Sequence, residues 1–238
     1  MARGPIRVHP RRSTPVTPSR LLTPLAFAAV LPLALSGCGS PDYHYVKNSE
    51  QKTYFKVPSE WHRIDQRTLD GILSADDPDS AAARARPRLV WSVAYDAHEV
   101  PHPTHLYGVA SDQPFVWAVV RPLSKKEQDA VSLDMLRDTF LPVTENGRAE
   151  LAQRGGQLAG FELTRDQVLT PGGGLRGVRT TFNYRLPTSP DLQTFDVTAY
   201  VSDAGRLYVM VLRCSARCFH QRAAELDAIA RSFTVRND

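Results

Sequence analysis

The sequence lacks an apolar run long enough to cross a membrane as a helix. Its apolar stretch at residues 21–35 has fifteen residues and is interrupted by Pro24 and Pro32, whereas a spanning helix needs about 20. Acidic residues are absent from residues 1–37, which contain five arginines. A basic segment followed by a short apolar core is typical of an export signal peptide.

The rest of the chain lacks the positive charge that the whole sequence suggests. The formal net charge is +4 and the pI is near 9.1. Removing the five arginines of residues 1–37 from 29 Lys+Arg leaves 24, against 25 Asp+Glu, a net charge of −1. The basic character therefore belongs to the leader, and we expect no nucleic-acid partner.

A short motif, Leu35-Ser36-Gly37-Cys38, directly follows the apolar core. Small residues suit a peptidase site, and the thiol of Cys38 can form a thioether to diacylglycerol. The motif resembles the lipobox of bacterial lipoproteins, which implies cleavage before Cys38 and acylation of it, for example with palmitate. Two acyl chains suffice for stable anchoring. We therefore expect a lipid anchor on the extracytoplasmic face of the cell membrane; a chance cysteine after a secretory signal is the alternative.

Cysteine is scarce, with three in 238 residues. Lipidation would consume Cys38 and leave Cys214 and Cys218 as an even pair in a compartment where disulfides persist. We predict a structural disulfide between them. A redox pair or a two-thiolate metal site are the alternatives, but redox motifs favour two intervening residues and no further cysteines could complete a zinc site.

The hydrophobic pattern predicts a signal peptide at residues 1–37, a tether at 38–51 and a single α+β domain at 52–238. Apolar or alternating runs predict strands at 52–57, 89–95, 115–120, 178–185, 195–201 and 206–213. Residues 74–88 indicate an exposed loop. Ser132 can cap a short helix, and a stripe from Phe219 to Phe233 predicts a C-terminal helix.

Three segments resemble PsbP-like domains. They are the opening 55–61 (FKVPSEW), the middle 131–137 (VSLDMLR), and the close, in which residues 213–218 (RCSARC) lead into a helix that ends at Phe233. The resemblance implies an αβα sandwich around a curved antiparallel sheet, with the C-terminal helix packed on one face. Such domains are known among actinobacterial lipoproteins and are generally non-catalytic binding or assembly modules. The family has no catalytic motif to carry over.

Catalytic signatures are missing or out of context. His98, Glu99 and His102 match the zinc-protease pattern H-E-x-x-H, which requires both histidines on one helical face. Pro101 lies inside that motif and would break the helix at a cost of about 3 kcal/mol or more, so we predict a loop. The sequence has no G-x-S-x-G, and the glycines at 172–174 are not followed by Gly-Lys-Ser/Thr.

Three histidines, His98, His102 and His105, lie within eight residues. Imidazoles in one loop can bind a transition metal, but the interpretation that we favour is that these are solvated loop histidines. From the anchor, the disulfide, the fold resemblance and the missing catalytic signatures, we predict a tethered, non-enzymatic binding or assembly module without a cofactor, with an envelope protein as partner. The alternatives are a metal or small-ligand carrier that uses these histidines and an enzyme assembled from distant residues.

Overall fold

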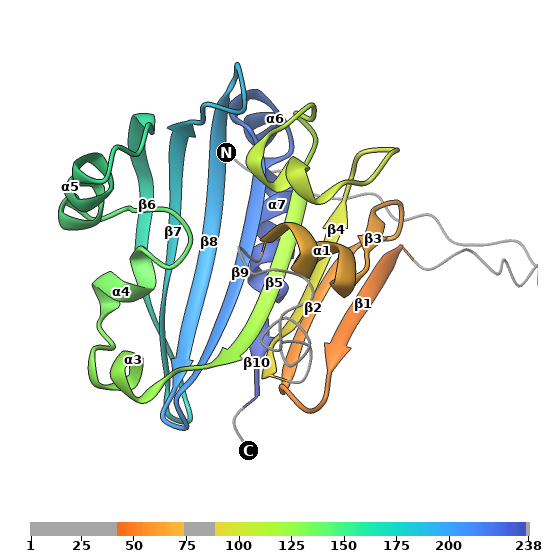
Figure 1. Cartoon of the computed structure of the whole chain (residues 1–238). Helices are drawn as coiled ribbons and strands as arrows, with labels where there is room; N and C mark the ends of the chain where they lie inside the picture. Colours follow the sequence, from red (N-terminus) through yellow and green to blue (C-terminus); the bar gives the residue numbers. More distant parts are fainter. Residues whose placement is uncertain (1–41, 74–88, 237–238) are drawn as a thin grey trace, which may run out of the picture. The chain divides into compact units, whose positions relative to one another are not determined.

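A seven-stranded antiparallel sheet forms the centre of the domain (Figure 1). The computed structural model describes residues 42–73 and 89–236, all within one compact unit, Ser40–Asp238. The strand order is β3-β4-β5-β9-β8-β7-β6. The strands are β3 (His62–Ile64), β4 (Trp91–Asp96), β5 (Phe115–Pro122), β6 (Ala159–Gly172), β7 (Leu175–Arg185), β8 (Leu192–Ser202) and β9 (Arg206–Ser215).

A smaller sheet consists of β1 (Tyr43–Asn48), β2 (Thr53–Pro58) and β10 (Thr234–Val235). The structure differs here from the predicted tether 38–51, because β1 pairs with β2 along its whole length. Only Val46 among the six side chains of β1 is buried, opposite Phe55. The composition of this segment is therefore that of an exposed edge strand, which resembles that of a loop. The folded part begins earlier than the predicted residue 52.

Both faces of the large sheet carry a hydrophobic core. Successive residues of β5 and β9 alternate between two clusters, so both strands are apolar almost throughout, as expected for strands buried on both sides. One cluster packs against α1, η1 and α4. The other packs against β2 and α7. The fold is therefore α+β, with a C-terminal helix on one face of an antiparallel sheet.

The helices are short. They are α1 (Gln66–Leu73), η1 (Pro103–Tyr107), α3 (Lys125–Asp129), α4 (Leu133–Arg137), α5 (Glu145–Gln153), α6 (Ala216–Gln221) and α7 (Ala223–Ser232). Ser132 caps α4 as predicted, since its hydroxyl accepts the N–H of Met135. The predicted single C-terminal helix is two helices, because Arg222 leaves the helical conformation. No helix within 42–73 or 89–236 is long and apolar enough to span a membrane.

Several predictions fall outside the described residues. The signal peptide at 1–37, the lipidation site Cys38 and the loop at 74–88 all belong to this group.

Candidate functional site

The sheet face that packs on α7 is apolar at its centre and polar along β6, β7 and β8. On β7 and β8, Arg179 lies opposite Thr198, Thr181 opposite Asp196, and Asn183 opposite Thr194. Their alternation with apolar residues arises because the other face of these strands belongs to the core, with Val178, Phe182 and Phe195. The sheet therefore presents a polar surface beside α7.

Five charged residues form a network on this surface, which we call the Arg–Asp cluster: Arg165, Arg179, Asp196, Asp227 and Arg231. Arg179 binds Asp196 through two hydrogen bonds, Nε to Oδ1 at 2.8 Å and an Nη to Oδ2 at 2.6 Å. Asp227 of α7 lies 2.9 Å from Arg179 and 2.7 Å from Arg231. Arg165 of β6 lies 3.6 Å from Asp196 and 3.5 Å from Asp227. The cluster therefore joins the helix to three strands.

The cluster contains one more guanidinium group than carboxylates, and two of its members have shifted pKa values. Burial alone would raise the pKa of Asp227, but contact with Arg179 and the charges of Arg231 and Arg165 lower it below its ordinary value. Burial alone would lower the pKa of Arg179, but Asp196 and Asp227 raise it. Three guanidinium groups thus face two carboxylates.

A groove of about 490 Å³ opens at the cluster. Its charged residues are Arg165, Arg179, Arg231 and Asp227, and its other lining residues include Gln167, Thr198, Tyr200 and Phe233. Tyr200 is half-buried at one end of the groove, and its ring lies 6.0 Å between centroids from that of Phe233, which is buried in the core. The arrangement can bind a carboxylate through a guanidinium and an apolar group against the Tyr200 ring.

The predicted histidine site is organised differently from a metal site. Asp96, fully buried at the end of β4, accepts the backbone N–H groups of His98 and His102 and lies 2.6 Å from Nδ1 of His105. Nδ1 of His98 accepts the N–H of Val100. The histidine side chains therefore form hydrogen bonds within the loop and to Asp96.

The rings of His98 and His105 lie close together, with centroids 4.8 Å apart, and that of His102 lies 6.0 Å from His105. Across residues 42–73 and 89–236, however, no group of three or more His, Cys, Asp or Glu side chains is arranged to hold a metal ion. Residues 98–102 are not helical, as Pro101 predicts, so the H-E-x-x-H pattern does not form a zinc-protease helix.

Arg213 is a buried residue that the sequence motifs missed. Its guanidinium donates to the carbonyl oxygens of Ser111 and Gln113 from below the loop at 97–114. Burial lowers the pKa of Arg213 to about 10, although the charges of Asp96 and Asp112 oppose this shift. The residues around Arg213 have the apolar pattern of a strand, and that pattern did not indicate that Arg213 would hydrogen-bond to this loop.

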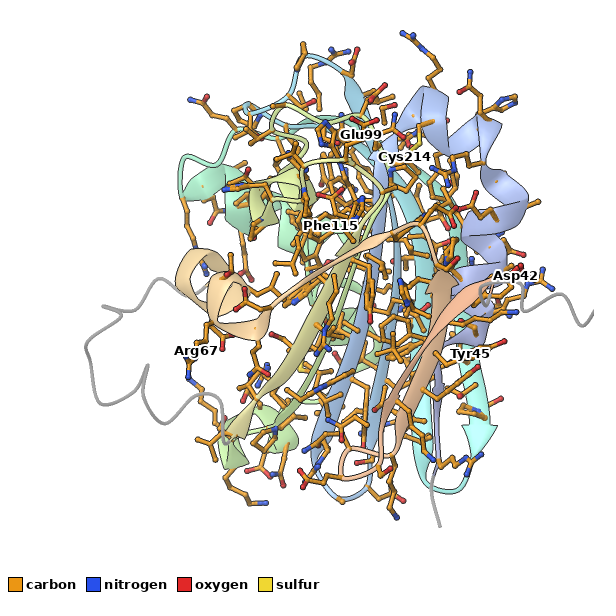
Figure 2. The ribbon with its side chains drawn as sticks, turned by 90° about the vertical axis from the view of Figure 1, so that its right-hand side faces the viewer. Asp42, Tyr45, Arg67, Glu99, Phe115 and Cys214 are labelled. Carbon is orange, nitrogen blue, oxygen red and sulfur yellow. A yellow bond between two sulfur atoms is a disulfide. The ribbon has the colours of Figure 1, made fainter. Side chains whose placement is uncertain are left out.

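Cys214 and Cys218 lie at disulfide distance, with Cα atoms 5.8 Å apart. Cys214 is at the end of β9 and Cys218 is in α6. A bond between them links the central strand to the helix that follows it. Figure 2 shows Cys214 and Glu99 towards the same end of the domain.

Comparisons with known proteins add a likeness of fold. The fold is similar to that of cyanobacterial PsbP. That solution structure, from Synechocystis sp. PCC 6803, matches with a TM-score of 0.49 and 12% identity, over 84% of this chain and 96% of that chain. No family model matches the sequence, and a search of curated proteins finds no match.

Two further solved structures are similar. LpqN of Mycobacterium tuberculosis, described as involved in cell envelope biogenesis, matches with a TM-score of 0.41 and 15% identity, over 81% of this chain and 90% of that chain. The Ran-binding protein Mog1p of Saccharomyces cerevisiae matches with a TM-score of 0.37 and 13% identity, over 81% and 95%. At these identities the likeness concerns the fold and transfers no activity.

Proposed function

We propose that this protein is a lipid-anchored, non-catalytic module on the extracytoplasmic face of the cell membrane, where it binds an envelope protein. The leader and the lipobox-like motif that ends at Cys38 support export and anchoring. The observation that carries the binding role is the groove at the Arg–Asp cluster, which offers guanidinium groups beside the ring of Tyr200.

The exposure of the cluster favours binding over a purely structural role. The side chains of Arg179 and Asp196 are almost fully buried, whereas that of Arg165 is 41% exposed and that of Arg231 is 74% exposed. The buried pair of Arg179 and Asp196 lies at the bottom of the groove, and the exposed Arg165 and Arg231 form a cationic rim around it. A partner segment with an acidic residue next to an apolar one complements this groove.

The groove contains no activated nucleophile. Its hydroxyl groups are those of Thr198 and Tyr200, and burial raises the pKa of Tyr200 above its ordinary value, which keeps the phenol protonated. In the part of the chain that the structure describes, no serine or cysteine is hydrogen-bonded to the Asp96–His105 pair. We therefore assign binding, and not acyl transfer, to this surface.

Site-directed crosslinking in intact cells tests the proposal. A photoreactive amino acid at Gln167, inside the groove, is expected to capture a specific envelope protein, whereas the same group at Arg154, the residue directly after α5, is expected to capture none. Replacing Cys38 with Ala should abolish capture by removing the anchor. Equal capture from positions 167 and 154, or none from either, would contradict the groove as the binding site.

Charge reversal gives a second measurement. Arg165→Glu with Arg231→Glu should abolish the crosslink at position 167, since the rim becomes acidic. The matched control is Lys125→Glu with Arg154→Glu, which reverses two exposed charges elsewhere and should leave the crosslink intact. Loss of the crosslink in both variants would show a dependence on net charge alone.

A further inference from the structure

The strands of the small sheet carry tyrosine and lysine side chains on their outward side. At one end of this side, Asp42, Glu60 and Glu225 line a hollow that also contains Tyr43 and Lys56. Tyr43, Tyr45 and Lys47 of β1 lie opposite Pro58, Lys56 and Tyr54 of β2. Residues opposite each other in a sheet share a face, and the intervening residues Val46, Phe55 and Val57 belong to the core on the other side. We call the five residues Tyr43, Tyr45, Lys47, Tyr54 and Lys56 the Tyr–Lys face.

The rings of this face form a continuous aromatic stripe. Tyr45 lies 6.4 Å from Tyr43 and 6.4 Å from Tyr54, measured between centroids, and it is 63% exposed. Lys56 Nζ lies 4.2 Å from the centre of the Tyr43 ring. Figure 2 looks onto this side of the domain and shows Tyr45 on β1 and Asp42 just before that strand.

A hollow of about 430 Å³ extends the face towards β10. Lys47, Lys52 and Arg236 are its charged lining residues; the others are Asn48, Ser49, Thr53, Tyr54 and Thr234. Among the residues that the structure describes, no acidic one lines it. Among the described carboxylates, none forms an ion pair with Lys47, Lys56 or Arg236. Ammonium, guanidinium and hydroxyl groups in one hollow suit a phosphate.

We propose that the Tyr–Lys face lies against an anionic phospholipid surface. Tyrosine is enriched where one end of a side chain is apolar and the other wet, as at lipid headgroups. Lysine can bury its stem while its ammonium binds headgroup phosphates. The hollow with Lys47, Lys52 and Arg236 would then hold a headgroup phosphate.

The position of β1 in the chain brings this face close to the proposed anchor. Asp42, which precedes β1, is four residues after Cys38, and four extended residues span at most about 14 Å. The inference therefore rests on the proposed lipid anchor, which would hold β1 beside the bilayer. It goes further by specifying the surface of the domain that contacts lipid and the charge of that lipid.

Lysine labelling of the native lipidated protein tests the contact. The protein is reconstituted in phosphatidylcholine vesicles with or without one part in three of phosphatidylglycerol, and treated with a water-soluble acylating reagent. Labelling of Lys47 relative to Lys125, whose side chain is 82% exposed on α3, should fall about fivefold with phosphatidylglycerol. High salt should restore it.

The same experiment separates the two proposals. A protein that fails to float with either vesicle has no anchor, and both proposals are then overturned. A protein that floats with both vesicles, but with the same Lys47 to Lys125 labelling ratio in each, keeps the anchor and overturns the lipid contact. Protection of Lys47 that needs a co-purified protein and not phosphatidylglycerol would also overturn it.

A matched pair of variants gives an independent readout. Lys47→Glu with Lys56→Glu reverses the charge of the face, and Lys125→Glu with Lys126→Glu does the same on exposed α3. On phosphatidylglycerol vesicles, nitration of Tyr45 should increase severalfold in the first variant and stay at the native level in the second. Equal nitration in both variants, each with native circular dichroism, would contradict the proposal.

Discussion

Asp96 binds three groups of one loop at once. Its buried carboxylate accepts the N–H groups of His98 and His102 and contacts the His105 ring. A buried carboxylate costs several kcal/mol unless it is paired and hydrogen-bonded, and here the loop at 97–114 supplies those partners. Arg213, also fully buried, fixes the other end of that loop at Ser111 and Gln113.

Replacing Asp96 with Asn should destabilise the protein by about 3 kcal/mol, because charge-assisted hydrogen bonds are lost and a buried amide is left poorly matched. Urea unfolding measures this free energy. Asp112→Asn is the control, since Asp112 is exposed and its side chain accepts a bond only from the neighbouring Gln113. A free energy of unfolding equal to that of the control would contradict the role assigned to Asp96.

At the scale of single residues, the sequence indicates which residue types are present but not which way their side chains point. Three histidines in eight residues predict a shared loop, and the structure has one. The His105 side chain points into the domain because it contacts Asp96 of β4. The sequence pattern does not show that the Asp96 carboxylate is buried at that position. The Arg–Asp cluster was missed for the same reason, because Arg179 and Asp227 meet only after α7 packs beside the sheet.

The short helix α3 shows a complete capping box. The hydroxyl of Ser124 accepts the N–H of Glu127, and the Glu127 carboxylate accepts the N–H of Ser124. The hydrogen bond from Arg121, followed by that from the Ser124 backbone, lowers the pKa of Glu127 to about 2. The carboxylate therefore stabilises the folded state in its ionised form.

Glu127→Gln should lower the free energy of unfolding at pH 7 by about 1 kcal/mol, since the cap and a partly exposed ion pair each contribute modestly. Because the folded-state pKa is depressed, this contribution is complete above the ordinary value of 4.5 and disappears as pH falls through about 2. Denaturation at pH 7 and pH 2 measures the difference. Asp129→Asn should change little, as its pair with Lys125 is exposed; a difference that persists at pH 2 would contradict the assignment.

The disulfide between Cys214 and Cys218, at the junction of β9 and α6, is expected to stabilise the fold. Replacing Cys214 and Cys218 with Ser should cost about 2 kcal/mol, the value for closing so short a loop in the chain-entropy model. Thermal unfolding with and without reductant measures it. Reductant should destabilise the native chain and leave the variant unchanged. A native chain insensitive to reductant would show that the two thiols are free.

Elements with a strong pattern were predicted, and elements without one were not. The alternation in β7 and β8 and the apolar runs of β4, β5 and β9 follow from burial on one or two faces. In contrast, α5 buries no residue and β1 buries only Val46. Such elements leave no periodic signal, because their position is set by caps and strand pairing.

At the scale of the whole molecule, β9 connects two parts of the sheet. Residues from Phe115 to Pro122 of β5 pair with Arg213 to Arg206 of β9, and β9 also pairs with β8. Among the described strands, β9 alone joins β3, β4 and β5 to β6, β7 and β8. The sequence predicted the α+β class and strands at 195–201 and 206–213, but the strand order depends on pairing between distant residues.

A chain that ends at Gly205 lacks β9, α6 and α7 and should therefore show no cooperative unfolding. A chain that ends at Arg236 retains every described element and should unfold as the full chain does. Circular dichroism during thermal unfolding distinguishes them. A sharp transition in the shorter chain would show that the remaining strands form a stable sheet without β9.

The late position of β9 also affects the order in which the protein can be made and moved. During synthesis, the first six strands of the large sheet would emerge before the one that unites them, and pairing across so long a stretch of chain is slow. For the export proposed above, such a delay matters where the chain crosses the membrane unfolded. The strand that completes the sheet would then keep the chain competent for translocation until most of it has crossed.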